Sequence, residues 1–228
     1  MPLIVVQPVT HTIAAVCEDT INAPDIAVLV FGDRRVPRSL RGLSIGGPDD
    51  VEAASEGARR LIVVGSDADL ASVLTRLLRA ERLDVELGFV SRRRSAATRA
   101  YRIPAGRRAA RRARLGSAQR VPLIRDETGT AIAGAAHWRP LDRAQLLHGE
   151  AVVDDAVLFD GEVAEVRIEP TATLPGLRAR AAGGRWLAGR AAQLGTTGVA
   201  VVRDGVSAPR AARRSTFYRN TEGWLLVR

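Results

Sequence analysis

The chain has 228 residues, of which 46% are hydrophobic, and a formal net charge of +9 at pH 7. This length and composition allow it to bury one large core or two small ones, and they exclude a disordered chain. It has no run of about 18 apolar residues and its first residues lack the basic flank of a secretory signal, so we expect no transmembrane segment and a cytoplasmic location.

The positive charge has two interpretations. All 34 basic residues are arginine and none is lysine, which is typical of a GC-rich genome and makes part of the charge a codon effect. A basic surface nevertheless attracts phosphates, so nucleic acid is a candidate partner. The aromatic content of 4% leaves few rings on which bases could stack. The single cysteine, Cys17, excludes an internal disulfide, and we interpret it as a small buried residue.

Up to about residue 116, short apolar runs alternate with stretches of helical periodicity, which indicates βα units and a largely parallel sheet. Strands are expected at 3–8, 26–31, 61–64 and 83–90, and helices at 51–60 and 70–80. The second helix carries apolar residues at the i, i+3, i+4 spacing of a face that packs against a sheet, namely Leu70, Val73, Leu74, Leu77 and Leu78.

The sequence LIVVGSDADL runs from an apolar strand through small and acidic residues into a helix. The start of a helix offers unpaired backbone N–H groups and a positive dipole end, which bind phosphate when glycines allow its approach. The candidate ligand-binding residues here are Gly65, Ser66, Asp67 and Asp69. A structural interpretation stays open, because Asp67 suits the N-cap of the helix and Asp69 in its first turn complements the dipole.

An arginine-dense segment follows, in which Pro104 and Gly106 predict two short helices, or a helix and a loop. Arginines fall on both faces of the second helix and make it basic nearly all round: Arg107, Arg111 and Arg114 on one face, Arg108 and Arg112 on the other. Arginine binds phosphate in a bidentate manner, so a lipid head group, a nucleotide or a polynucleotide is a suitable partner. A solvated face is the structural alternative.

After residue 118 the pattern changes to short strands separated by turn signals, which indicates an antiparallel sandwich. Turns are expected at 127–129, 160–161 and 204–205, and only 185–195 has the spacing of a helix. We therefore expect two domains, an α/β domain at 1–118 and a β-sandwich domain at 119–228.

Aromatic residues in the second half are interpreted as core rather than as a platform for bases. They are Trp138, Trp186, Phe217 and Trp224. The stretch WLLVR at 224–228 is expected to be a terminal strand that closes the sandwich.

His148, Glu150 and Asp154 form a candidate metal cluster. Alternate side chains of a strand share one face, so these three could converge. No spacing here matches a recognised zinc pattern, and solvated carboxylates at a hairpin edge are the alternative. Glu150 with Asp160 or Glu162 is a candidate acid pair.

The order of these parts resembles the diacylglycerol kinase and related lipid kinase family, whose catalytic fold is shared with NAD kinases. That family carries a Gly-Gly-Asp-Gly-Thr loop after a strand of its first domain. Here Gly65 and Asp67 match this loop, while Ser66, Ala68 and Asp69 depart from it. The added Cβ atoms hinder the approach of backbone to phosphate, and a carboxylate in place of threonine brings like charge toward the ligand.

Two further elements of the family are partly retained. A Pro-x-Gly-Thr-x-Asn-Asp-x-Ala-Arg element that leads into Ile-Pro is similar here at Arg99, Ile103 and Pro104, while 92–96 differs. An Asp-Gly-Glu near the end of the sandwich is matched by Asp204 and Gly205, but Val206 replaces the glutamate thought to help deprotonate the lipid hydroxyl. Valine can accept no proton.

The resemblance implies an α/β domain, a β-sandwich domain and an active site in the cleft between them. We expect a lipid-kinase-like protein whose kinase motifs have decayed, leaving a cleft for an anionic, phosphorylated small molecule or lipid head group. Its arginines would be Arg92, Arg93 and Arg94, facing the loop at 65–69. No cofactor is expected for this function, and the oligomeric state stays open.

Two alternatives remain. The first is a divergent ATP-dependent diacylglycerol or lipid kinase, in which Asp67 or Asp69 holds Mg²⁺ and Glu162 replaces the missing base. ATP and Mg²⁺ would then be required. The second is a nucleic-acid-binding protein that uses the arginines of the segment 92–114.

Overall fold

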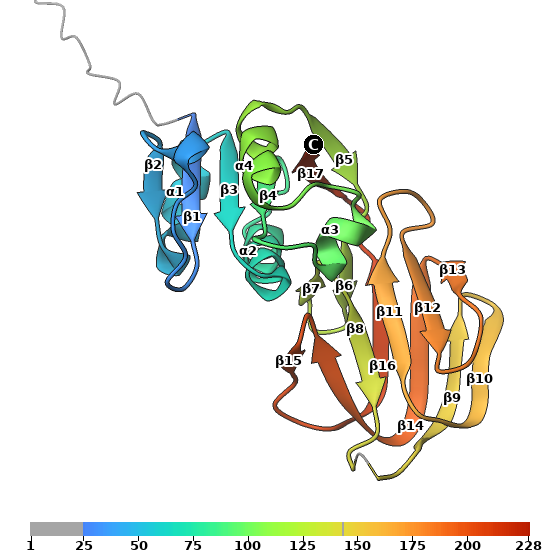
Figure 1. Ribbon diagram of the computed structural model, residues 1–228. Helices are drawn as coiled ribbons and strands as arrows, with labels where there is room; N and C mark the ends of the chain where they lie inside the picture. Colours follow the sequence, from blue (N-terminus) through green and yellow to red (C-terminus); the bar gives the residue numbers. More distant parts are fainter. Residues whose placement is uncertain (1–24, 143) are drawn as a thin grey trace, which may run out of the picture.

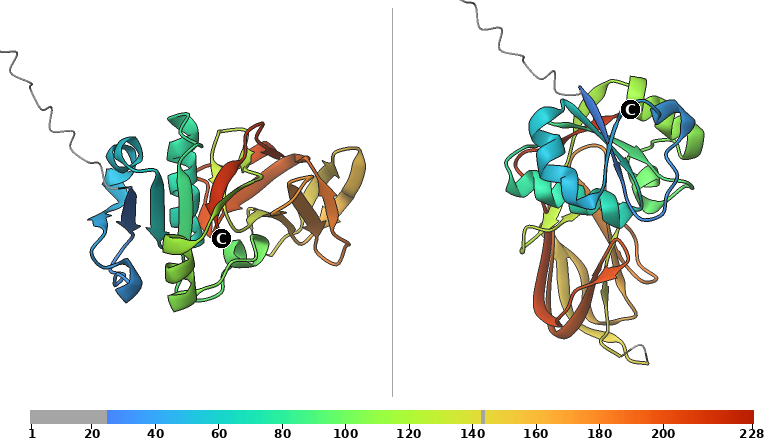
Figure 2. Two further views of the ribbon diagram at one scale, coloured as in Figure 1. Left: turned by 90° about the horizontal axis from the view of Figure 1, so that it is seen from above. Right: turned by 90° about the vertical axis from the view of Figure 1, so that its left-hand side faces the viewer.

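The computed structural model describes residues 25–142 and 144–228, which form an α/β part and an antiparallel β part next to each other (Figure 1). The strand expected at 3–8 and Cys17 lie outside the described residues. Two views at right angles show the β part extending from one side of the α/β part (Figure 2). The expected combination of an α/β part with a β-rich part is confirmed.

The α/β part is built on a six-stranded sheet with the order β2-β1-β3-β4-β17-β5. All neighbouring strands are parallel except the pair of β17 and β5, so the prediction of a largely parallel sheet is confirmed. The strands are β1 (Ile26–Val30), β2 (Ser44–Gly46), β3 (Arg60–Val64), β4 (Glu86–Val90), β5 (Ala118–Val121) and β17 (Trp224–Val227).

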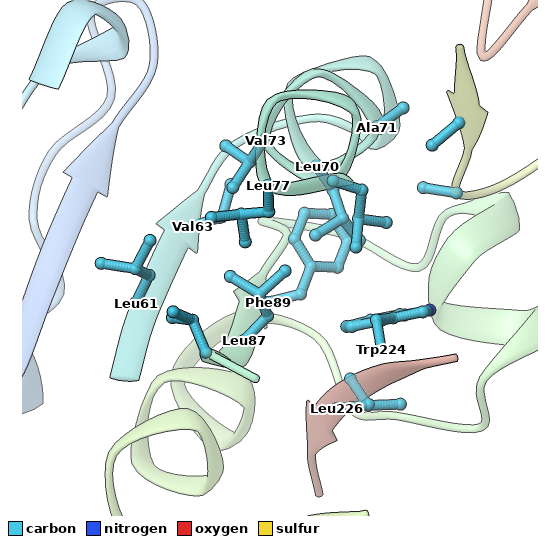
Figure 3. Packing of buried hydrophobic residues seen from close by; sticks show 14 of the residues in the cluster. Leu61, Val63, Leu70, Ala71, Val73, Leu77, Leu87, Phe89, Trp224 and Leu226 are labelled. Carbon is cyan, nitrogen blue, oxygen red and sulfur yellow. The ribbon is translucent and has the colours of Figure 1, made fainter. Parts of the chain in front are cut away.

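Helices cover both faces of this sheet. They are η1 (Arg38–Leu40), η2 (Pro48–Asp50), α1 (Val51–Gly57), α2 (Asp67–Arg79), α3 (Ala96–Ala100) and α4 (Gly106–Leu115). The predicted apolar face of α2 is buried on the sheet, where Leu70 and Leu77 pack with the side chains of β3, β4 and β17 (Figure 3). The opposite face of the sheet is covered by α4 and η1.

The helix α4 is not basic all round, because its inner side is made of alanine. Ala109, Ala110 and Ala113 are buried against β4. A Cβ added to Gly88 of β4 would lie only 2.6 Å from the Cβ of Ala113, so the small residues allow helix and strand to approach closely. All the arginines of α4 are therefore confined to its outer side and its ends.

The β part is an antiparallel sheet of eleven strands with the main order β13-β12-β11-β8-β14-β16-β6-β7, to which β9, β10 and β15 add. The long strand β14 pairs with β9 and β16 through its first half and with β8 through its second half. The strands are β6 (Ile124–Asp126), β7 (Ala131–Ile132), β8 (Ala136–Arg139), β9 (Leu147–Val153), β10 (Ala156–Val163), β11 (Val166–Pro170), β12 (Leu177–Ala181), β13 (Leu187–Gly189), β14 (Ala191–Arg203), β15 (Val206–Ser207) and β16 (Ala212–Arg219).

Three predictions about this half are corrected. The stretch 185–195 is not a helix but contains β13 and the start of β14, where Ala192 and Leu194 are buried and Gln193 is exposed, the alternation of a strand. The turn predicted at Asp160 and Gly161 is not formed, because both residues lie inside β10, and the chain turns instead between β9 and β10. The terminal strand β17 does not close the sandwich, because it pairs with β4 and β5.

Of the aromatic residues expected in the core, Trp186 is not core. Tyr218 beside Phe217 is also only partly buried, with the Arg125 guanidinium 4.5 Å from its ring centroid. Trp138, Phe217 and Trp224 are fully buried, as predicted. Trp186 is only half-buried, and the guanidiniums of Arg178 and Arg180 lie 4.4 Å and 4.8 Å from its ring centroid. Its ring therefore contributes a cation–π contact at the surface.

Within the ranges that the structure describes, the helices are all too short or too polar to cross a membrane.

Trp224→Ala should be strongly destabilising, because Trp224 is 1% exposed and packs edge-on against Tyr101 with ring centroids 5.2 Å apart. Loss of a buried tryptophan typically lowers the free energy of unfolding by about 3–5 kcal/mol. Chemical denaturation measures this loss, and Trp186→Ala is the matched control with a smaller expected effect. Equal effects of the two changes would contradict the placement of β17 in the core.

Candidate functional site

An open pocket lies at the carboxyl ends of β3 and β4, where the turn between β14 and β15 faces them. Ligand sites of parallel α/β sheets occur at this edge. The pocket has a volume of about 590 Å³. It is lined by Arg34, Gly65, Ser66, Asp67, Ser91, Arg92, Arg93, Arg94, Ser95 and Asp204. The structure thus brings together the loop after β3 and the arginine triplet after β4.

The loop between β3 and α2 is closed by its own side chains. Ser66 is the N-cap of α2, and its backbone N–H and hydroxyl both donate to Oδ2 of Asp69, each at 2.7 Å. The Ser66 hydroxyl accepts in return from the Asp69 N–H at 3.3 Å, which completes a capping box. Asp67, expected as the N-cap, is instead the first helical residue. The serine hydroxyl can bond back to the helix, which leaves the Asp67 carboxylate for other contacts.

Asp69 occupies the place at which a phosphate loop would hold its anion. A Cβ added to Gly65 would lie 2.8 Å from Oδ2 of Asp69, so the carboxylate is in contact with the loop backbone. Nη1 of Arg34 lies 3.4 Å from the same oxygen. The positive end of α2 therefore already has a negative partner within the chain.

Asp67 connects the starts of two helices. Its Oδ2 accepts from the backbone N–H of Ala97, in the first turn of α3, at 3.1 Å. Its Oδ1 is buried and has no hydrogen-bond partner among the described residues. A carboxylate oxygen in this position can accept a proton or a hydrogen bond, or bind a cation.

Asp204 is held by backbone N–H groups of the segment between β7 and β8. Its Oδ1 accepts from Gly134 at 2.6 Å and Ala135 at 2.9 Å, and its Oδ2 accepts from Ala133 at 2.8 Å. A Cβ added to Gly134 would lie 2.6 Å from Oδ2 of Asp67 and 2.9 Å from Oδ1 of Asp204. Gly134 therefore lies between the two carboxylates, and any side chain there would collide with both.

The pKa of Asp204 is raised from 3.8 to about 6, and burial is the largest cause. The three backbone hydrogen bonds oppose this rise in pKa, and the negative charge of Asp67 contributes to it. Loss of hydration is thus the main reason that this carboxyl binds its proton more tightly than usual.

Arg92, Arg93 and Arg94 are exposed, and within the described residues none of them has an ion pair or a side-chain hydrogen bond. The backbone that carries them is fixed at both ends. The Ser91 hydroxyl donates to the carbonyl of Arg93 at 2.8 Å, and Ser95 caps α3. Three guanidiniums are therefore presented to the pocket from a defined loop.

A second pocket of about 600 Å³ continues the first along the sheet edge. The two pockets share Arg34, Ser91 and Arg92, and the second also includes Arg35 and Arg107. The cleft therefore extends over the ends of β1, β3 and β4, and most of its charged side chains are arginines.

The other predicted site residues do not reach this cleft. His148 and Glu162 are cross-strand partners on β9 and β10 and line a different pocket with Leu141. The Asp154 carboxylate accepts from the backbone N–H groups of Arg190 and Ala191 at 3.0 Å and 2.9 Å.

No metal cluster results from these residues. In the described ranges, no three His, Cys, Asp or Glu side chains are grouped closely enough to hold a metal ion, so His148, Glu150 and Asp154 do not converge. Glu150 does lie opposite Asp160, but on the hairpin of β9 and β10 and not in the cleft. Because Asp154 lies in the turn after β9, it does not continue the alternation of that strand.

Four residues that line the pocket are missing from the predicted site, namely Arg34, Ser91, Ser95 and Asp204, and two of them are charged. The signal for Asp204 is the Asp-Gly pair that matches the third family element. Arg34 follows β1, and the carboxyl end of a parallel strand next to β3 has to border the same edge.

No protein-family model and no curated protein matches the sequence. Solved structures do match over most of the chain. A diacylglycerol kinase from Bacillus anthracis str. Sterne is 11% identical with a TM-score of 0.70, covering 90% of this chain and 97% of that one. An NAD kinase from Archaeoglobus fulgidus in complex with ATP is 10% identical with a TM-score of 0.62, covering 89% and 93%.

A yeast NADH kinase complexed with NADH is 9% identical with a TM-score of 0.54, covering 90% of this chain and 83% of that one. At such identities these matches establish the fold alone. The chain has the fold shared by diacylglycerol kinases and NAD kinases, which confirms the resemblance at that level.

Asp67→Asn should lower the pKa of Asp204 below about 6, because it removes a nearby negative charge, but not to 3.8, because burial remains. In the wild type, the contribution of Asp204 should make the free energy of unfolding fall as pH rises from 3.8 to about 6, since the native state binds this proton more tightly than the unfolded chain. Carbon-13 NMR of the carboxyl groups measures the pKa. The exposed Asp155→Asn is the control, and a wild-type Asp204 that titrates near 3.8 would contradict the described environment.

Proposed function

We propose that the protein binds an anionic, phosphorylated small molecule or lipid head group in the cleft at the ends of β3 and β4, and that it does not transfer phosphate. The observation that carries this proposal is the triplet Arg92, Arg93 and Arg94, which lines the pocket without an ion-pair partner in the described parts of the chain. Guanidiniums bind phosphate oxygens through paired, charge-assisted hydrogen bonds.

The loop after β3 supports binding by arginine rather than by a phosphate loop. The Asp69 carboxylate already accepts from the Ser66 N–H and contacts Arg34. A nucleotide phosphate at this position would have to displace Asp69 and would meet its negative charge. The residues present therefore fit a triphosphate at the loop poorly.

Val206 stands where the resembled kinase family has the glutamate of its Asp-Gly-Glu element, and this replacement also supports a function without phosphoryl transfer. Val206 follows the Asp204-Gly205 pair, is 59% exposed and accepts no proton. Glu162, the predicted substitute, lines a separate pocket on the hairpin of β9 and β10. Among the described residues, the carboxylates that line the cleft are then Asp33, Asp67 and Asp204.

The double change Arg92→Gln and Arg94→Gln should weaken binding of phosphorylated probes at least about tenfold, because a hydrogen bond to a charged group contributes about 1.5–3 kcal/mol. Calorimetric titration with inorganic pyrophosphate and with dihexanoyl phosphatidic acid measures the affinity and separates a free phosphate from a lipid head group. The matched control is Arg79→Gln with Arg185→Gln, two exposed arginines that do not line the pocket. Absence of binding by both probes, or equal weakening in the control, would refute the proposal.

One observation favours a second candidate, a divergent ATP-dependent lipid kinase. Oδ1 of Asp67 is a buried acceptor without a partner among the described residues, and Asp204 lies beside it. Asp67 could accept the proton of a hydroxyl substrate or be a ligand of Mg²⁺. ATP would supply the phosphoryl group, and Mg²⁺ would neutralise its charge.

The kinase candidate predicts transfer of label from ATP to a short-chain diacylglycerol in the presence of Mg²⁺. Asp67→Asn should abolish this transfer, while Asp155→Asn should leave it unchanged, because Asp155 is exposed in the turn between β9 and β10. Transfer with this pattern would replace the non-catalytic proposal. Its absence in the wild type would remove the kinase candidate.

A further inference from the structure

The positive charge of the chain is concentrated in one segment. Residues 91–115 contain ten arginines and no acidic residue. Without these ten, the 34 basic residues fall to 24, against 25 acidic residues in the rest of the chain. Codon bias would spread arginine over the whole surface, so it does not explain this concentration.

The segment also borders a further pocket, here called the basin, which is separate from the loop after β3. This basin has a volume of about 780 Å³ and lies between the end of α3 and the outer side of α4. Five arginines line it together with Ile103, Pro104 and Ala105, namely Arg94, Arg99, Arg102, Arg108 and Arg112. All five are exposed, and none has an ion-pair partner within the described residues.

Arg102 has a backbone conformation that favours glycine. Its φ is +54°, and it follows α3 at the position where helices commonly end in glycine. The N–H of Ile103 donates to the carbonyl of Thr98 and that of Arg102 to the carbonyl of Arg99, the pattern of a Schellman motif. An arginine here costs stability relative to glycine, and the sequence nevertheless places a fifth guanidinium at the basin.

The shape and lining of the basin indicate its occupant. A basin can admit a chain of phosphates, whereas a planar membrane surface cannot follow it. The apolar side of α4 is buried on β4 and is not available to insert into lipid. Among the described residues, no aromatic side chain lines the basin, so bases would not stack on this lining.

We propose that this basin binds single-stranded nucleic acid through its phosphates and without sequence preference. A flexible strand can follow guanidiniums around a concave surface, while a duplex with a persistence length of about 150 base pairs cannot. This inference is independent of the small-molecule site proposed above, although Arg94 borders both pockets.

Fluorescence anisotropy with a labelled oligo-dT of about 20 nucleotides, titrated between about 50 and 200 mM salt, tests the proposal. Contact with four or five phosphates gives a slope of log affinity against log salt of about −3 for a single strand. The triple change Arg99→Gln, Arg108→Gln and Arg112→Gln should weaken binding at the lowest salt more than about tenfold and reduce the slope by about 2. The control triple is Arg79→Gln, Arg185→Gln and Arg210→Gln, which removes the same charge from exposed sites elsewhere.

Arg102→Gly separates binding from folding. This change relieves the positive φ, so the melting temperature should rise or stay the same, while the affinity for oligo-dT should fall. The small-molecule site has its own readout, because pyrophosphate binding should be unchanged in Arg102→Gly.

Any of four results would overturn the inference. They are absence of oligo-dT binding at the lowest salt, equal weakening in the two triple variants, unchanged affinity in Arg102→Gly, and binding of vesicles that contain phosphatidylglycerol by a protein that does not bind oligo-dT.

Discussion

Two carboxylates lie on opposite sides of one glycine at the cleft, where the α/β part meets the β part. Asp67 comes from the start of α2 and Asp204 from the turn after β14, and both lie against Gly134. Their desolvation and mutual repulsion are costly, and four backbone hydrogen bonds offset that cost. The start of α3, the segment between β7 and β8 and the turn after β14 are therefore positioned by the same pair of charges.

Within the described ranges, the cleft differs from a phosphate loop in its free hydrogen-bond donors, which are arginine side chains and not backbone N–H groups. At the start of α2, the N–H of Ser66 is bound to Asp69, so the backbone there is not available to an external anion. The exposed guanidiniums at 92–94 have no such internal partner in the described residues. Specificity for a ligand would then come from flexible side chains, and affinity would depend more strongly on ionic strength than it does for a site made of backbone dipoles.

Local sequence patterns are sufficient to predict the helices and strands that pack in the parallel sheet. They are not sufficient to predict which strands far apart in the chain pair with each other. The helix α2 and the strands β3 and β4 each show one clear hydrophobic periodicity. Because β3 and β4 are parallel neighbours, the loops that follow them have to meet at the same edge of the sheet. The pattern of the stretch 185–195, which contains several alanines, is compatible with a helix or a strand. Pairing with distant strands makes its second part the start of β14. Glu162 and Asp204 could not be placed from the sequence, because the register of sandwich strands depends on contacts between residues far apart in the chain.

The strand β17 lies between β4 and β5, so one inner strand of the α/β sheet comes from residues that follow the entire β part. Synthesis of the chain proceeds from its amino end, and β4 has no partner on that side until Leu225 and Leu226 reach it. Folding of the first half cannot be completed on the ribosome before the second half has been made. Pairings of this sequence separation slow folding and leave a sheet edge exposed in the meantime, where a chaperone or another nascent chain can bind.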